Sequence, residues 1–60
     1  MEIKENDWIL YQKNSDILEG QVVQILKTEK NVIYIKIMSK ACILTWYKLD
    51  NIVVIAVLSQ

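Results

Sequence analysis

The chain has 60 residues, of which 53% are hydrophobic, and 7 basic side chains balance 7 acidic ones to a net charge of zero. A chain of this length hides only about 60% of its unfolded surface, so such domains usually need a disulfide, a metal or a partner as reinforcement. One cysteine and no histidine exclude an internal disulfide and an ordinary zinc site. We therefore expect a single domain over residues 1–60, without metal or cofactor, that packs efficiently or associates with itself.

The same composition excludes most catalytic chemistry. Without histidine, the commonest general base is missing. The single glycine, Gly20, cannot form a phosphate-binding loop, and the carboxylates are scattered along the chain with no paired spacing. We expect that the protein is not an enzyme.

The chain also gives an expectation for its location. Its start, MEIKENDW, is charged and does not have the basic and then apolar order of a secretion signal. The longest apolar run, residues 52–58, is far shorter than the roughly 20 residues that a membrane helix needs. Together with the free cysteine, this predicts a cytoplasmic protein that does not enter the membrane.

The hydrophobic pattern has a period of two, which predicts strands rather than helices. It predicts an all-β domain with five strands, at about 7–12, 20–27, 32–38, 41–47 and 52–58. Segment 13–19, KNSDILE, contains turn formers and is too long for a tight hairpin, so we expect a longer loop there. A helix over residues 16–26 is the alternative, which Gly20 and the β-branched residues that follow it disfavour.

The second connection is expected to be a three-residue loop, Glu29-Lys30-Asn31, with Asn31 in the left-handed conformation that asparagine tolerates. This loop pairs Thr28 with Val32 and places Ile25 opposite Ile35 and Val23 opposite Ile37. Ile33, Ile35 and Ile37 then share one face, which we expect to be the core.

The third connection is expected to be a two-residue turn, Ser39-Lys40. It pairs Met38 with Ala41 and Ile37 with Cys42, so that apolar residues meet on the buried face. Cys42, Leu44 and Trp46 are then predicted to lie in the core, and Tyr47 to point outward. After this strand, KLDN at residues 48–51 is expected to form one tight helical turn before the last strand.

These elements resemble the SH3-like small barrels, the group that includes KOW and Tudor-like domains. Asn6-Asp7-Trp8-Ile9 is similar to the Gly-Asp-x-Val element that opens such domains, with asparagine in place of glycine. Residues 20–25, GQVVQI, are similar to the Gly-x-Val-x-x-Ile that follows, and Trp46-Tyr47 with Leu49 to the closing aromatic and helical turn. The resemblance implies a five-stranded SH3-like barrel and indicates fold rather than function, because these domains have many activities.

The outward face of the second to fourth strands is the first candidate site. We expect it to present a partner-binding set that is mostly apolar, with tyrosine and methionine as in protein interfaces: Leu26, Tyr34, Lys36, Met38, Ile43 and Tyr47. The alternatives are that the register differs by one residue or that the N-terminal residues or loop 13–19 cover this face. The C-terminal run, IVVIAVL, lacks alternation and is the second candidate, because it could pair with its equivalent in another subunit as a homo-oligomer.

The third candidate is basic. Residues 1–26 hold two lysines and five carboxylates, whereas residues 27–60 hold five lysines and two carboxylates. Four of these lysines lie on the two central hairpins and, with Tyr34 and Tyr47, could bind single-stranded nucleic acid: Lys27, Lys30, Lys36 and Lys40. The absence of arginine and the neutral chain disfavour this alternative.

The leading hypothesis is therefore a small, non-catalytic protein-binding module that associates with itself. It would act as a regulator, inhibitor or adaptor of the kind that phages and mobile elements encode, although this last step is an analogy. The alternative is a KOW-like nucleic-acid-binding module.

Overall fold

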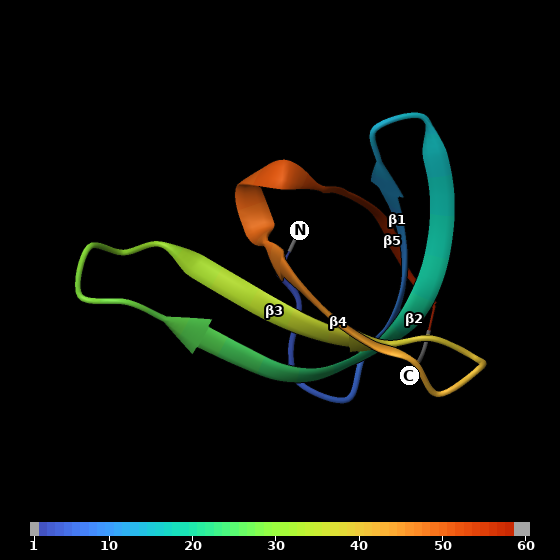
Figure 1. The fold of residues 1–60 in the computed structure, drawn as a ribbon, viewed down its shortest axis with the longest axis horizontal. Coiled ribbons are helices and arrows are strands. Elements are labelled where there is room, and N and C mark those ends of the chain that lie inside the picture. The colour runs from blue at the N-terminus through green and yellow to red at the C-terminus, as the bar shows by residue number, and fades with distance from the viewer. Residues whose placement is uncertain (1, 59–60) are drawn as a thin grey trace.

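The computed structural model describes residues 2–58 and is an all-β domain, as the sequence predicts. Its five strands are β1 (Trp8–Lys13), β2 (Asp16–Lys27), β3 (Ile33–Met38), β4 (Leu44–Lys48) and β5 (Val53–Val57). All neighbouring strands are antiparallel, and their order in the sheet is β4-β3-β2-β1-β5. The sheet curves strongly around the interior, and the β2–β3 hairpin extends beyond the rest of the molecule (Figure 1).

Strand β2 joins the two halves of the sheet. Its first half pairs with β1, from Lys13↔Asp16 to Trp8↔Gln21, and its second half pairs with β3. Gly20 lies next to the point where the pairing changes, and an added Cβ there would stand 2.5 Å from Ile37 Cγ2 and 2.7 Å from the Met38 carbonyl oxygen. Glycine is required here because β2 approaches β3 so closely.

The core lies inside this curve and is mainly aliphatic. The residues buried there come from three strands, β1, β2 and β3, and from the residue just before β5: Ile9, Tyr11, Val22, Ile35, Ile37 and Ile52. Burial of each such aliphatic side chain stabilises the fold by roughly 1.5–3 kcal/mol, so this small group supplies much of the driving force. Ile35 and Ile37 are in the core as predicted, and Ile33 packs against it.

The β2–β3 hairpin has the predicted loop. The Thr28 amide donates to the Val32 carbonyl over 2.9 Å, and Asn31 has a φ of 65°, in the left-handed region. Ile25 lies opposite Ile35, also as predicted. The structure differs from the predicted pairing beyond Gln24. A β-bulge between Val22 and Gln24 makes Val22, and not Val23, the partner of Ile37.

The β3–β4 hairpin differs from the prediction of a two-residue turn. The Ser39 amide donates to the Ile43 carbonyl over 2.9 Å, so the loop has three residues, and Cys42 takes the left-handed conformation with a φ of 63°. Met38 therefore pairs with Leu44, and Ile35 pairs with Tyr47. This register is three residues away from the predicted one, and an odd shift turns every side chain of β4 to the opposite face.

The expected positions of the two adjacent aromatics are consequently exchanged. Trp46 is exposed, and the prediction that it lies in the core is wrong. Tyr47 packs against the core instead, where its hydroxyl accepts a hydrogen bond from the Tyr11 hydroxyl over 3.1 Å. Cys42 and Leu44 are also exposed, contrary to their predicted burial.

The β1–β2 connection is shorter than predicted. β2 begins at Asp16, which pairs with Lys13, so only Asn14 and Ser15 form the turn. Asn14 has a φ of 55°, which asparagine tolerates, and this residue makes a tight hairpin possible. Segment 13–19 is therefore mostly strand, and residues 16–27 are not helical.

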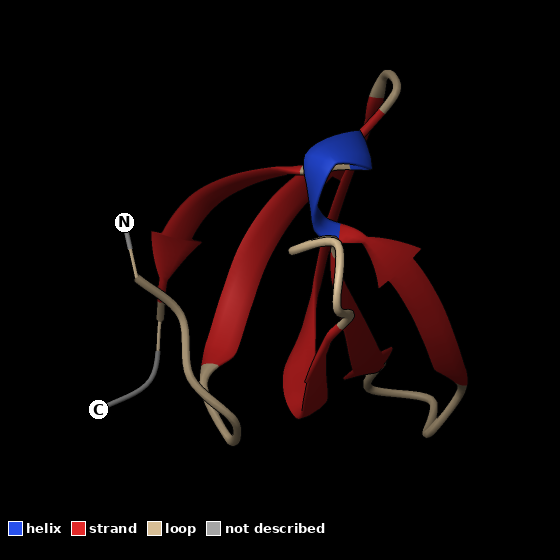
Figure 2. Ribbon diagram, turned by 90° about the vertical axis from the view of Figure 1, so that its left-hand side faces the viewer, coloured by secondary structure: helices blue, strands red, loops and turns tan. Residues whose placement is uncertain are grey.

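The last elements agree with the sequence. A short 3-10 helix, η1 (Leu49–Asn51), turns the chain from β4 toward β5 and is drawn in blue in Figure 2. Ile52 follows η1 and is buried. In β5, Val53 and Ile55 are exposed while Val54 packs inward, so one face of this strand meets the core and the other does not.

Candidate functional site

The face of β2, β3 and β4 that points away from the core is the main candidate site, and we call it the outer face. Cross-strand pairing aligns Leu26, Tyr34 and Lys48 in one row and Gln24, Lys36 and Trp46 in the next. A third row pairs Met38 with Leu44. The outer face is thus defined by Gln24, Leu26, Tyr34, Lys36, Met38, Leu44, Trp46 and Lys48.

Most of the outer face is apolar although it meets solvent. Leu26 is 47% exposed, Trp46 is 47% exposed and Leu44 is 54% exposed. One face of an antiparallel sheet is commonly solvated, and it is then normally polar. Large apolar side chains gathered on such a face are typical of a binding surface.

Four of the six residues predicted to bind a partner share the outer face: Leu26, Tyr34, Lys36 and Met38. Ile43 lies just before β4, in the β3–β4 loop, and is 63% exposed. Tyr47 points inward and does not belong to the outer face. Neither the N-terminal residues nor segment 13–19 conceals Leu26, Leu44 and Trp46, since these side chains remain exposed in residues 2–58.

Trp46 and Leu44 are the two outer-face residues that sequence reasoning assigned to the core. Their outward direction can be inferred from the likeness of two loops, Thr28–Val32 and Ser39–Ile43. In each loop, the first residue has a hydroxyl group that accepts a hydrogen bond from the backbone amide of the last residue. The distance is 3.1 Å in the first loop and 3.2 Å in the second. The second hydroxyl therefore indicates a second three-residue loop, which gives the observed register.

Lys36 and Trp46 form the most specific contact on the outer face. The Lys36 ammonium lies 5.2 Å from the centroid of the Trp46 ring, within the range of a cation–π interaction. The two side chains are a cross-strand pair of β3 and β4. This contact fixes a positive charge beside the largest exposed ring of the face.

The predicted lysines are not gathered in one place. Lys36 lies on the outer face, whereas Lys27 and Lys30 lie at the end of β2 and in the loop after it. Lys40 forms an ion pair with Glu19 over 2.6 Å, and the Trp8 indole N–H donates to the same carboxylate over 3.0 Å. The Lys40 contact and then the Trp8 contact hold the pKa of the Glu19 carboxyl below its usual range.

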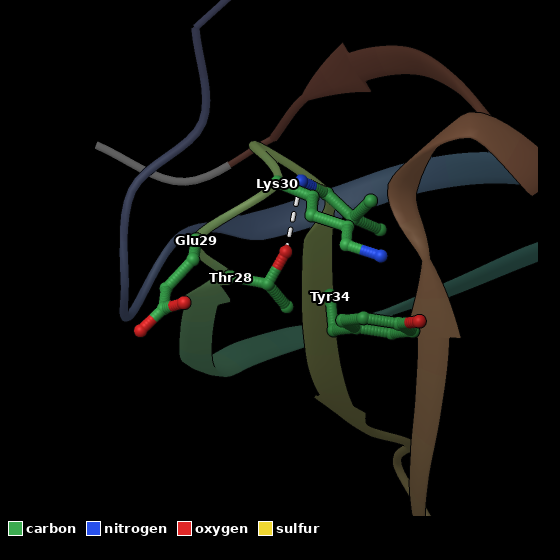
Figure 3. Close-up of a pocket in the computed structure, with 5 residues that line it drawn as sticks. Thr28, Glu29, Lys30 and Tyr34 are labelled. Atoms are coloured by element: carbon green, nitrogen blue, oxygen red, sulfur yellow. Dashed lines mark hydrogen bonds between the residues drawn. The ribbon is translucent and has the colours of Figure 1, made fainter.

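A shallow hollow of about 440 Å³ adjoins the outer face at the tip of the β2–β3 hairpin. It is lined by Thr28, Glu29, Lys30, Val32 and Tyr34. Figure 3 shows the Tyr34 ring and the Lys30 side chain on one side of the loop, while the Glu29 carboxylate points away from them. The hollow thus extends the outer face with an aromatic ring and a positive charge.

A second hollow of about 200 Å³ lies at one end of the core, lined by Glu2, Ile3, Ile25, Ile33, Ile35 and Leu49. It has a single carboxylate and otherwise aliphatic walls. The buried Tyr11 ring and the half-buried Tyr47 ring contact each other edge to face, with 5.3 Å between their centroids. Burial and, second, the contact with Tyr47 raise the pKa of Tyr11. These features are packing inside the domain rather than a reactive site.

Other classes of site are not found in the part of the chain that the structure describes. No group of three or more His, Cys, Asp or Glu side chains in residues 2–58 is placed to hold a metal ion. Within the same range, no helix has the length and apolar character to cross a membrane. No protein-family model, curated protein or solved structure matches the chain.

Proposed function

We propose that this chain is an SH3-like small barrel of the KOW and Tudor-like group that binds another protein through its outer face. The strand order β4-β3-β2-β1-β5, with a 3-10 turn before the last strand, supports the family. Asn6 supports it too, because its φ of 78° explains why this position of the resembling element takes glycine. The protein would act as a regulator, an inhibitor or an adaptor of its partner, without catalysis.

The observation that carries the proposal is the set of exposed apolar side chains on the outer face. Leu26, Leu44 and Trp46 are each about half exposed on one sheet face, beside Tyr34 and Met38. Tryptophan, tyrosine and methionine are the residues enriched in protein interfaces. A partner that covers this face would remove a large apolar area from water, which is the main driving force of association.

The test is capture of partners by the tagged protein from a lysate of its native host, with and without nuclease. The Tyr34→Asp, Trp46→Asp double variant should lose the captured proteins, because it puts two charges into the apolar face. Ile17→Asp is the matched control, since Ile17 is exposed on β2 but outside the outer face. Equal capture by all three proteins, each with an intact unfolding transition, would overturn the proposal.

Self-association is the second part of the proposal and involves the other end of the sheet. β5 is an edge strand, and Val53 and Ile55 leave apolar side chains exposed on it. Two copies of such an edge can pair and extend the sheet. Sedimentation velocity over a range of concentrations should show a dimer or larger oligomer that Val53→Lys with Ile55→Lys dissociates, whereas Ile43→Lys should not change it.

Nucleic-acid binding is the alternative function, with Lys27, Lys30, Lys36 and Lys40 as its candidate residues. The position of Lys30 beside the Tyr34 ring favours it, because single-stranded binders combine cations with exposed rings. Lys40 supports it less, since this ammonium is paired with Glu19. Binding to mixed single-stranded oligonucleotides should then weaken steeply with salt and disappear when Lys27, Lys30 and Lys36 are changed to Glu.

A further inference from the structure

Strand β4 presents an edge that is open to a further strand. It stands at one end of the strand order, and in residues 2–58 its outer edge has no neighbouring strand. Leu44, Thr45 and Trp46 are all exposed, and β4 contains neither proline nor a bulge. Open edges of this kind are templates for pairing with another chain, and proteins usually protect them.

The charge on the outer face beside this edge is of one sign, although the exposed Asp50 follows in η1, two residues after Lys48. Lys36 and Lys48 lie on the outer face, and none of the residues that define this face is acidic. The Glu29 carboxylate points away from Tyr34 and Lys30, and the Glu19 carboxylate is engaged by Lys40. A partner with carboxylates would therefore meet complementary charge here, whereas a basic partner would be repelled.

The Lys36–Trp46 contact favours a polypeptide over a nucleic acid. Single-stranded nucleic acids bind by stacking bases on exposed aromatic faces. One face of the Trp46 ring is already covered by the Lys36 ammonium at 5.2 Å. The aliphatic side chains of Leu26 and Leu44 also suit apolar side chains better than phosphates.

We propose that the edge of β4 takes an extended, acidic segment of a partner protein as an added strand. Side chains of the added strand that point to the outer face would alternate with those that do not. Apolar residues would stand beside Leu44 and Trp46, and a carboxylate beside Lys48. This inference rests on the proposed protein-binding function and names the class of partner segment and the strand that holds it.

The probe is a synthetic peptide, acetyl-Glu-Thr-Val-Thr-Val-Thr-Glu-amide, whose alternate residues are Glu, Val, Val and Glu. Its sequence reads the same from both ends, so these side chains can point to the outer face in either strand direction. Its matched control replaces both Glu by Lys, and a second control carries an N-methyl group on every backbone amide. The readout is the change in backbone amide shifts of residues 44–48 in an isotope-labelled protein as peptide is added. We expect the acidic peptide to bind about tenfold more tightly than the basic one, because the charge pair with Lys48 changes from attractive to repulsive.

Charge reversal on the protein provides the second arm. Lys48→Glu should weaken binding of the acidic peptide and strengthen binding of the basic one. Lys4→Glu, at an exposed residue outside the outer face, should change the affinity for neither peptide. N-methylation should abolish binding, since an added strand needs its amide hydrogen bonds. Equal affinity of the acidic and basic peptides, or binding that survives N-methylation, would overturn the inference.

Two further outcomes separate this inference from the proposed function. If the host proteins are captured through Tyr34 and Trp46 but the acidic peptide does not shift residues 44–48, the protein-binding function stands and the added strand is refuted. If a ten-residue oligothymidylate shifts these amides and the acidic peptide does not, the occupant is a nucleic acid and both proposals are wrong.

Discussion

At the scale of single residues, Cys42 occupies a conformation that suits another amino acid. Its φ of 63° lies in the left-handed region, where the other such residues of the described chain are all asparagine: Asn6, Asn14 and Asn31. A side chain other than glycine, asparagine or aspartate costs roughly 1–2 kcal/mol in that region. The β3–β4 loop therefore forms at the expense of some stability.

Cys42→Gly should raise the free energy of unfolding by about 1 kcal/mol, because glycine adopts this φ without strain. Urea unfolding followed by circular dichroism measures the change. Ala41→Gly is the matched control, since Ala41 is exposed in the same loop and has no positive φ, and it should not stabilise the protein. A loss of stability in Cys42→Gly would contradict the conformation described for this loop.

The adjacent aromatics Trp46 and Tyr47 should respond oppositely to truncation. Tyr47→Ala should cost about 3 kcal/mol of unfolding free energy, because its ring packs on the core and its hydroxyl bonds to Tyr11. Trp46→Ala should cost no more than about 1 kcal/mol, since its side chain is half exposed. Thermal unfolding of the two variants decides between this register and the one in which Trp46 is buried.

At the scale of elements, the Glu19 contacts tie β2 to the loop between β3 and β4. Lys40 and Trp8 lower the pKa of Glu19 in the folded protein from its ordinary value of 4.5. A carboxyl whose pKa is depressed by folding adds stability that is present above its unfolded pKa and is lost as the pH falls through the folded pKa. The contribution of this bridge should therefore disappear on acidification below about pH 4.5.

Glu19→Gln should flatten this part of the pH dependence, because the amide cannot form the ion pair. The measurement is the urea midpoint at pH 7 and at several pH values below 4.5, compared with the unchanged protein. Glu29→Gln is the control, since Glu29 is exposed in the β2–β3 loop and does not contact Lys40. Identical acid profiles for the Glu19→Gln variant and the unchanged protein would show that the bridge does not contribute to stability.

The elements also show how far the sequence predicts this structure. Runs of apolar and β-branched residues identify five strands, and the short polar break KLDN predicts η1, because local patterns determine both. Loop Thr28–Val32 is predictable because Asn31 marks its left-handed position. Loop Ser39–Ile43 has the same geometry, but a cysteine stands at that position, so a shorter turn looked equally compatible with the hydrophobic pattern.

That one loop determines the part of the candidate site that β4 contributes. Leu26, Tyr34, Lys36 and Met38 could be placed on one face from the sequence because β2 and β3 have the expected pairing near the hairpin tip. Trp46 and Tyr47 could not, since an added loop residue changes which of two neighbouring aromatics points inward. Both faces of β4 carry apolar residues, so hydrophobicity alone does not discriminate between the two registers.

At the scale of the whole molecule, the two halves of the sheet share strand β2 and meet at Gly20. Gly20→Ala should lower the free energy of unfolding by about 1–3 kcal/mol, because the new methyl group would press against Ile37 and the Met38 carbonyl. Gln24→Ala, at an exposed position of the same strand, should change stability by less than about 0.5 kcal/mol. Chemical unfolding of both variants tests this, and an unaffected Gly20→Ala would mean that the halves do not meet so closely.

The sheet as a whole has two open ends with different character. β4 ends it beside Lys36 and Lys48, whereas β5 ends it with Val53 and Ile55 and no charged residue. The N-terminal segment lies against β2 and not against either of these two edge strands. The Asn6 amide donates a hydrogen bond to the Val22 carbonyl, and the Glu5 carboxylate accepts one from the Ile25 amide. A heterologous partner at β4 and a second copy at β5 could therefore bind the same molecule at once.

The exposed Cys42 thiol has a practical consequence for studying these surfaces. It is the one cysteine of the chain and lies two residues before β4 begins. A maleimide dye or spin label attached there would modify one defined position without any engineered substitution. The protein thus carries a natural attachment point from which the approach of another chain to β4 can be followed by fluorescence or magnetic resonance.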